Sequence, residues 1–251
     1  MSAKPRIAFF EFTSCEGCQL TVVDSLQDHP ELLDAVEIVQ FREAMSEKGE
    51  DYQIAFIEGS CSRPGDEARI REIRERAAIV IALGACAHLG GVNAIRNRMP
   101  LQEVREVVYG DKADWFETYE PRPIADVIPV DAAIPGCPID RKEFIMAVTH
   151  LLQGRMPRIP DQPLCMECKL KENICVYTQG KVCLGPITLA GCDAICPTYG
   201  DGCEGCRGMI SNPNIPAMRQ VMHEHGMTDE EIDSKLSMFL TNQIMALEEA
   251  G

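Results

Sequence analysis

Near its N-terminus the chain reads RIAFFEFTSCEGCQL over residues 6–20. Residues 6–12 form an apolar run with the length of a buried strand, and a helical pattern begins at Gln19. Cys15 and Cys18 lie in the connection between them. In a parallel sheet such a connection lies at the carboxyl edge, where these folds place their binding sites. The stretch therefore predicts an α/β unit whose first loop carries two thiols.

Short apolar runs alternate with helical patterns through the following residues. The patterns predict further strands at 36–41, 52–57, 78–83 and within 127–134, and helices at 19–26, 65–76 and 140–152. Short buried strands joined by helical crossovers favour a doubly wound parallel sheet of flavodoxin-like type. The fold class expected is thus α/β.

A proline-rich stretch at residues 156–163 predicts a domain boundary. We expect a flavodoxin-like domain over residues 5–157 and a smaller, coil-rich and cysteine-rich domain with C-terminal helices over residues 158–251. A capping box at residues 228–231 (TDEE) opens the terminal helix. Its apolar face consists of Ile232, Leu236, Phe239 and Ile244 and is expected to pack on the cysteine-rich domain or on a neighbouring subunit.

Thirteen cysteines stand in the 251 residues. Four of them follow separate predicted strands, so they are expected to meet at one sheet edge: Cys15, Cys18, Cys86 and Cys137. Glycines beside three of these positions, Gly17, Gly84 and Gly136, are expected to allow tight turns and close backbone approach. Four unrelated buried thiols would have no reason to share an edge, so this arrangement favours a common ligand.

Eight more cysteines crowd into the second domain: Cys165, Cys168, Cys175, Cys183, Cys192, Cys196, Cys203 and Cys206. Disulfides are disfavoured, because disulfide scaffolds are short and secreted and this chain opens without an export segment. Structural zinc is a stronger alternative, since two C-x2-C pairs each suit half of a four-thiolate site. The dispersed first four cysteines favour iron-sulfur clusters instead, and a zinc-stabilised interaction module stays as a remote alternative.

The composition limits the partners. With 24 basic and 39 acidic residues the formal net charge is -15, which argues against nucleic acid or an anionic membrane as partner. No apolar run approaches the roughly 20 residues of a membrane span. A cytoplasmic chain without direct membrane insertion is therefore expected.

Several motifs together resemble a known family. They are FTSCEGC at residues 12–18, EGS at 58–60, GACA at 84–87, GG at 90–91 and PGCP at 135–138. These resemble the small, electron-transfer subunit of [NiFe] hydrogenases, and similar motifs occur in the iron-sulfur subunit beside the quinone site of respiratory complex I. The cysteine pattern of the second domain resembles cytoplasmic hydrogenases of the sulfhydrogenase and methanogen types. A complex I-like or membrane-hydrogenase-like subunit is the alternative, which the eight further cysteines disfavour.

The resemblance implies three [4Fe-4S] clusters and a ligand set for each. The proximal cluster would take Cys15, Cys18, Cys86 and Cys137; the distal cluster Cys165, Cys168, Cys175 and Cys183; the medial cluster Cys192, Cys196, Cys203 and Cys206. Cys165 stands where membrane-linked relatives use histidine, and Cys196 completes a medial set that has three cysteines in them. Thiolate-only sites favour lower potentials.

The same resemblance implies partners and excludes bond chemistry in this chain. Hydrogen would react at the nickel-iron site of a separate large subunit, and electrons would pass to NAD(P), ferredoxin or flavin partners such as flavoprotein/iron-sulfur diaphorase-type subunits. The remaining cysteine, Cys61, is expected to be packed and inert. Glu16 and Glu58 are expected at the sheet edge, where a carboxylate could relay protons, and the sequence decides no role for His88.

Overall fold

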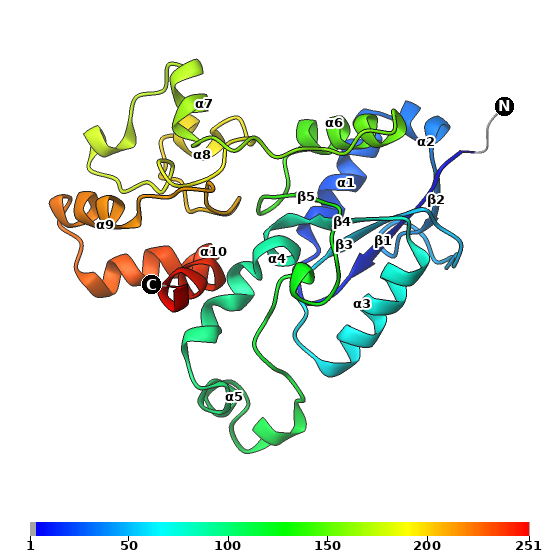
Figure 1. Cartoon of the computed structure of the whole chain (residues 1–251), viewed down its shortest axis with the longest axis horizontal. Helices are drawn as coiled ribbons and strands as arrows, with labels where there is room; N and C mark the ends of the chain where they lie inside the picture. The colour runs from blue at the N-terminus through cyan, green and yellow to red at the C-terminus, as the bar shows by residue number, and fades with distance from the viewer. Residues whose placement is uncertain (1–3, 251) are drawn as a thin grey trace. The chain divides into compact units, whose positions relative to one another are not determined.

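Five parallel strands form one sheet in the computed structural model, which describes residues 4–250 (Figure 1). The strands are β1 (Arg6–Glu11), β2 (Glu37–Gln40), β3 (Ile54–Glu58), β4 (Ile79–Leu83) and β5 (Ala132–Ile134). They are ordered β2-β1-β3-β4-β5, and every neighbouring pair is parallel. The chain leaves β1 in one direction and β3 in the other, so the prediction of a doubly wound, flavodoxin-like sheet is confirmed.

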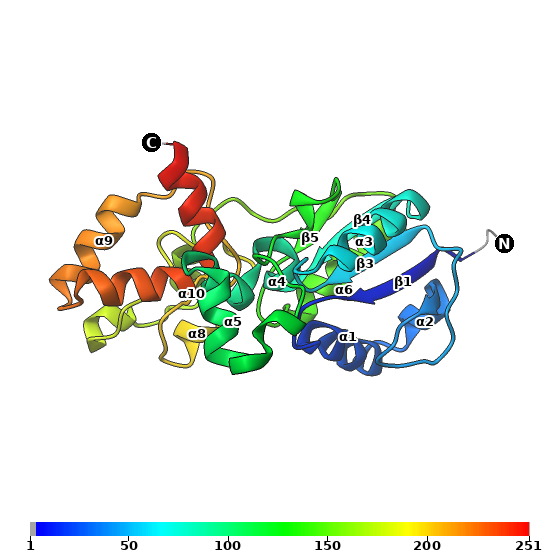
Figure 2. The ribbon, with the colours of Figure 1, turned by 90° about the horizontal axis from the view of Figure 1, so that it is seen from below.

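Helices cover both faces of this sheet. Helices α1 (Gly17–Asp28) and α6 (Arg141–Leu152) pack on one face, and α3 (Pro64–Arg76) packs on the other; Figure 2 brings α3 in front of the strands. In β1, Ile7 and Phe9 enter the core under α1 and α6, whereas Ala8 and Phe10 enter the core under α3. Burial on both faces explains why the strands read as continuous apolar runs.

The connection between β4 and β5 departs from the simple alternation that the sequence indicates. It contains α4 (Gly84–Leu89), η1 (Gly91–Arg98), α5 (Leu101–Tyr109), η2 (Gly110–Trp115) and η3 (Ile124–Asp126). Helix α5 buries none of its residues, and three of the other segments are 3-10 helices. A 3-10 helix lacks the 3.6-residue period on which a sequence-based prediction rests, whereas α5 carries apolar residues at helical spacing, at Leu101, Val104 and Val108.

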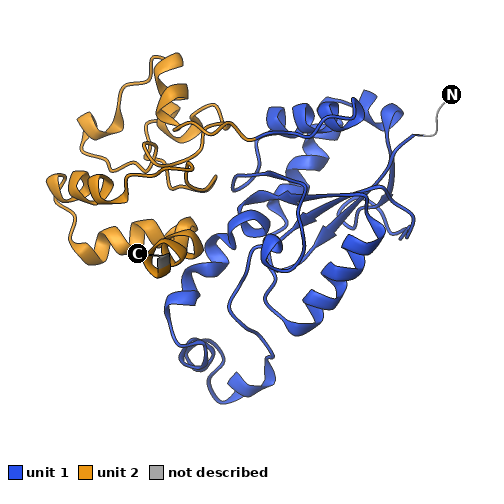
Figure 3. Cartoon of the chain, viewed as in Figure 1, with its two compact units in different colours: residues 1–158 blue, residues 159–251 orange. Residues whose placement is uncertain are grey.

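The chain divides into two units, Met1–Arg158 and Ile159–Gly251 (Figure 3). The second unit contains short helices around its cysteines, α7 (Cys165–Leu170), η4 (Val176–Gln179) and α8 (Ile195–Thr198), followed by α9 (Ile215–Glu224) and α10 (Asp229–Ala250). One small buried cluster joins Leu164, Val176, Cys183, Ala194 and Cys203, so two of its five residues are cysteines. Apolar side chains elsewhere in the unit are buried as well, among them Ile187, Met222 and Leu240. Within residues 4–250, no helix is both long and apolar enough to cross a membrane.

Helix α10 begins at the capping box and packs on the cysteine-rich segment. The backbone N-H of Thr228 donates to Glu231 Oε2 at 2.8 Å, and the N-H of Glu231 donates to Thr228 Oγ1 at 3.3 Å. The predicted apolar face is buried, and Leu240 beside it lies against Gly205, in the loop that carries Cys203 and Cys206. Both predictions for this helix are confirmed.

Thr228→Ala should loosen the start of α10. The substitution removes the hydroxyl that accepts the N-H of Glu231, and loss of such a cap costs about 1 kcal/mol. Hydrogen-deuterium exchange should therefore accelerate in the first turn of α10 and stay unchanged in α9. Equal acceleration in the two helices would contradict the local role of the cap.

Candidate metal centres

Four cysteines of the first unit lie together at the carboxyl edge of the sheet. These sheet-edge thiols are Cys15 and Cys18 before and in α1, Cys86 in α4, and Cys137 after β5. Burial, with the charges of Cys137 and Cys15 adding to it, raises the pKa of Cys86 to about 12. Burial likewise raises the pKa of Cys18, with Glu58, Cys137 and Cys86 adding to the effect. The four thiols therefore lie near one another at this edge, and their binding of a common metal group stays a prediction.

Glycine allows the close approach that brings these thiols together. Gly84 has φ +83° and Gly136 has φ +132°, conformations that L side chains rarely adopt. A Cβ on Gly84 would collide with Cys18 Sγ. Gly17 also allows close approach, because a Cβ there would lie 3.3 Å from Cys15 Sγ, whereas the left-handed residue of this turn is Glu16, with φ 63°.

Glu58 holds the loop that carries Cys18. Its side chain is buried, with the residue 2% exposed, and its two oxygens accept the backbone N-H groups of Cys18 (3.1 Å) and Gln19 (3.0 Å). These groups lie in the first turn of α1, whose N-H groups have no partner within the helix. Burial raises the pKa of the Glu58 carboxyl, and the two backbone N-H groups oppose that rise. The sequence located this carboxylate at the sheet edge but did not predict its contacts.

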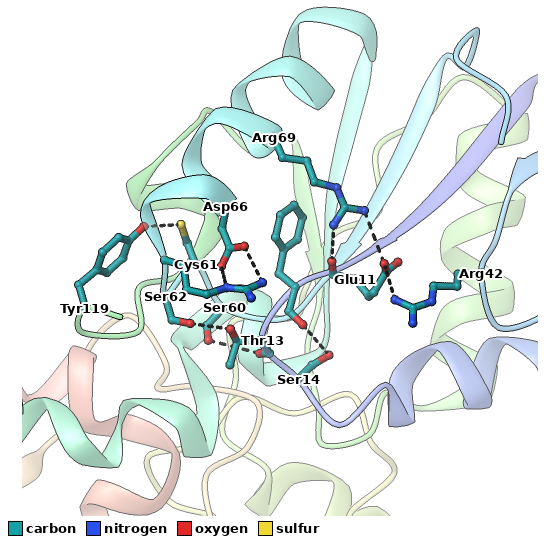
Figure 4. A network of polar contacts seen from close by, with 12 residues as sticks. Glu11, Thr13, Ser14, Arg42, Ser60, Cys61, Ser62, Asp66, Arg69 and Tyr119 are labelled. Atoms are coloured by element: carbon teal, nitrogen blue, oxygen red, sulfur yellow. Dashed lines mark hydrogen bonds and ion pairs between the residues drawn. The ribbon is translucent and has the colours of Figure 1, made fainter. Parts of the chain in front are cut away.

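A polar network ties the Cys15 loop to the segment after β3 (Figure 4), and Asn93 extends it to the segment after Cys86. Thr13 and Ser60 exchange backbone hydrogen bonds of 3.2 and 2.9 Å, and the hydroxyls of Thr13 and Ser62 lie 2.5 Å apart. Asn93 in η1 donates to Thr13 O at 2.8 Å. No pattern in the sequence identifies these residues, because each acts through a partner distant in the chain.

Cys61 is sealed inside the same unit. It is 0% exposed, and its Sγ lies 2.8 Å from the hydroxyl of Tyr119, which also donates to Glu67 (Figure 4). Burial raises the pKa of the Cys61 thiol. The prediction of a packed cysteine is confirmed. His88 lies in the last turn of α4, two residues beyond Cys86.

Four cysteines of the second unit line one cavity. The cavity has a volume of about 170 Å³, and its walls include Cys165, Cys168, Cys175 and Cys183, here called the α7 thiols. Burial, with Cys183, Cys168 and Cys175 adding to it, raises the pKa of Cys165 to about 11. The backbone N-H of Gly185 points at Cys183 Sγ at 3.4 Å. The structure thus brings this set together around a partly open cavity.

The remaining cysteines, Cys192, Cys196, Cys203 and Cys206, here called the C-terminal thiols, are gathered less tightly. Burial raises the pKa of Cys203, and Cys183 and Cys206 add to the rise. The charges near Cys196 include Asp201, Glu204 and Cys183, and those near Cys192 include Arg207 and Glu167. Cys203 thus lies near Cys206, while Cys192 lies near Arg207, the residue after Cys206, and Cys196 lies near Glu204, the residue after Cys203.

The chemistry of these thiols fits a polynuclear metal group. A buried thiol with a raised pKa ionises only when a positive charge comes close, and bound iron supplies such a charge. The cavity between the α7 thiols provides the space, and N-H groups beside the sulfurs can donate to thiolate ligands. Across residues 4–250, no three His, Cys, Asp or Glu side chains are placed to hold a single ion.

Comparison with known proteins identifies the family. Residues 15–151 match the family described as "NADH ubiquinone oxidoreductase, 20 Kd subunit". The chain is 39% identical to sulfhydrogenase 2 subunit delta of Pyrococcus furiosus, over 93% of this chain and 98% of that protein. It is 33% identical to a subunit of the vhu F420-non-reducing hydrogenase of Methanocaldococcus jannaschii, over 81% of each chain.

A solved structure agrees with these relatives. A chain of an NAD+-reducing [NiFe]-hydrogenase in the H2-reduced state superposes with a TM-score of 0.57 at 27% identity, over 63% of this chain and 96% of the other. The family match alone is confined to the first unit, but the sequence relatives extend over both. The chain belongs to this family, and within it to the hydrogenase subunits.

Gly84→Ala should destabilise the first unit. The new methyl group would be forced against Cys18 Sγ on a backbone with positive φ, so we expect a loss of at least about 1 kcal/mol. Urea unfolding followed by circular dichroism measures the effect. Gly65→Ala in α3 is the matched control, because its Cβ meets nothing within 4 Å and its backbone is unstrained. Similar stability of the two variants would contradict the close approach at Gly84.

Proposed function

We propose that this chain is the electron-transfer subunit of a cytoplasmic [NiFe] hydrogenase and that it holds three [4Fe-4S] clusters. The observation that supports the proposal is that four thiols meet at the carboxyl edge of the sheet and four others line one cavity beside α7, with four more cysteines in the segment that follows. The sheet-edge thiols would hold the proximal cluster, the α7 thiols the distal cluster, and the C-terminal thiols the medial cluster. Each cluster, when bound, accepts and releases single electrons.

The residues around the thiols would set the properties of these sites. Glu58 fixes the loop of Cys18 through two backbone N-H groups, and Thr13 fixes the loop of Cys15 through Ser60 and Asn93. Backbone N-H groups point at sulfur in the second unit, from Cys203 to Cys183 at 3.2 Å and from Gly205 to Cys203 at 3.4 Å. Such contacts orient thiolate ligands and stabilise the negative charge on them.

The proposed partners are the nickel-iron large subunit, where hydrogen would react, and a flavin/NAD(P)- or ferredoxin-linked subunit that exchanges electrons with this chain. The relatives support this choice, since their names include a sulfhydrogenase and an NAD+-reducing hydrogenase. Thiolate-only ligand sets also suit low-potential carriers. Each unit has its own part in the proposal: residues 5–157 carry the proximal site, and residues 158–251 carry the other two.

The location proposed is the cytoplasm, where thiols stay reduced. All thirteen cysteines lie within the described residues, and each is a free thiol there. Cysteine persists in that form in reducing compartments.

Iron analysis of two cysteine variants tests the function. Anaerobically purified protein should contain about twelve irons and little zinc. Cys86→Ser should lose about four irons and stop hydrogen-dependent dye reduction in the assembled enzyme, because it removes a sheet-edge ligand. Cys61→Ser is the matched control and should retain both iron and dye reduction, since its sulfur is buried against Tyr119.

Two outcomes would contradict the proposal. Stoichiometric zinc in the wild-type protein would favour the structural-zinc alternative for the second unit. Loss of a whole cluster from Cys61→Ser would show that the thiols are assigned to the wrong sets. Hydrogen-deuterium exchange catalysed by the large subunit should survive in Cys86→Ser, because that reaction exports no electrons.

A further inference from the structure

The loop that carries Cys192 has a backbone shape that its own sequence does not favour. Asp193 and Ala194 are consecutive left-handed residues, with φ 59° and 48°. Neither is glycine, and alanine is a poor choice for this conformation. Two such residues in succession persist only where surrounding contacts determine the backbone.

Glu167 supplies those contacts from the other ligand set. It stands between Cys165 and Cys168 in α7, and its two carboxylate oxygens accept the backbone N-H groups of Gly191 (2.7 Å) and Ala194 (3.0 Å). These N-H groups flank Cys192 on both sides. Lys171, just after α7, adds an ion pair to Asp193 with Nζ and Oδ2 2.8 Å apart. The loop is thus held from α7 at three points.

The two sets are also joined in the opposite direction. The backbone N-H of Cys203 donates to Cys183 Sγ at 3.2 Å, and the N-H of Leu184 donates to Cys203 O at 2.9 Å. Ligand loops of each set are therefore fixed by residues of the other. Charge-assisted hydrogen bonds of the kind that Glu167 makes are stronger than neutral ones, so Glu167 dominates this connection.

We propose that Glu167 is a positioning residue for the C-terminal thiols: it shapes the Cys192 loop for metal binding although it ligates nothing. The inference rests on the proposed function. Metal binding by the α7 thiols and by the C-terminal thiols is then interdependent, because α7 must be formed before the Cys192 loop takes its shape. The spacing of the cysteines in the sequence predicts two sites that bind metal independently.

Glu167→Gln tests this role with all thirteen cysteines intact. A glutamine side chain keeps one acceptor oxygen and replaces the other with an NH₂ donor, so it can accept only one of the two backbone N-H groups. Iron content should fall from about twelve to about eight, with the loss of one cluster's EPR signal on reduction. Amide exchange over residues 190–196 of the protein as purified should accelerate roughly tenfold or more.

Glu224→Gln is the matched control, because Glu224 is an exposed carboxylate of the same unit and bonds only to Gln220 within α9. It should leave iron, EPR signals and exchange unchanged. Amides of α9 and α10 report in the same exchange experiment whether the unit remains folded. If they lose protection in Glu167→Gln, Lys171→Gln replaces it as the milder variant, and unchanged exchange over residues 190–196 would then overturn the role of α7.

The outcomes separate this inference from the proposed function. Wild-type protein with about twelve irons and Glu167→Gln with the same irons and unchanged exchange would overturn the role of Glu167 and leave the function standing. Wild-type protein well short of twelve irons would overturn the three-cluster function. In that case the exchange over residues 190–196 still decides whether Glu167 shapes the loop.

Discussion

The cost of ionising thiols that are crowded together is the constraint on which the rest of this structure depends. Burial and neighbouring cysteines raise the pKa of Cys86 and Cys165, so thiolates can coexist there only with positive charge among them. Elements far apart in the sequence must therefore hold the neutral thiols together until that charge arrives. In the first unit a complete five-stranded sheet with two apolar cores provides the holding force, and the loops at its carboxyl edge add the local hydrogen bonds.

The second unit brings its cysteines together on short helices and loops. One of its buried clusters is small and includes Cys183 and Cys203, so two of the proposed ligands are part of the core. Contacts between loops therefore replace contacts between sheets and helices, and α10 covers the segment of Cys203 with a long apolar face. A unit built in this way gains much of its stability on binding metal. The two units thus position their cysteines differently. In the first unit a sheet holds the cysteine loops, and in the second unit the cysteine loops hold one another.

The sheet and the position of the first four cysteines could be predicted from the sequence for physical reasons. Strands buried on both faces, such as β1, leave an apolar run, and a cysteine directly after a strand must lie at its carboxyl edge. The connection between β4 and β5 was missed because three of its five segments are 3-10 helices, which lack the 3.6-residue period of an α-helix. Helix α5 carries apolar residues at helical spacing and could have been predicted. The contacts of Glu58 and Glu167 were missed because their partners are backbone N-H groups, which nearly every residue has. The left-handed conformation of Ala194 was not predicted either, because glycine and asparagine are the residues that indicate that conformation in a sequence.

The burial of Cys61 against Tyr119 has a consequence for how the protein survives the loss of its metal. A chain with ligand thiols in groups of four risks joining the wrong sulfurs when metal is absent or oxidant is present, and every additional accessible thiol multiplies the wrong pairings. Cys61 is 0% exposed and follows β3, within the same unit as the sheet-edge thiols. Because Cys61 is buried, it cannot form disulfides with the sheet-edge thiols. When the proposed site is empty, only its own four thiols can react with one another, and metal can bind again without competition from Cys61.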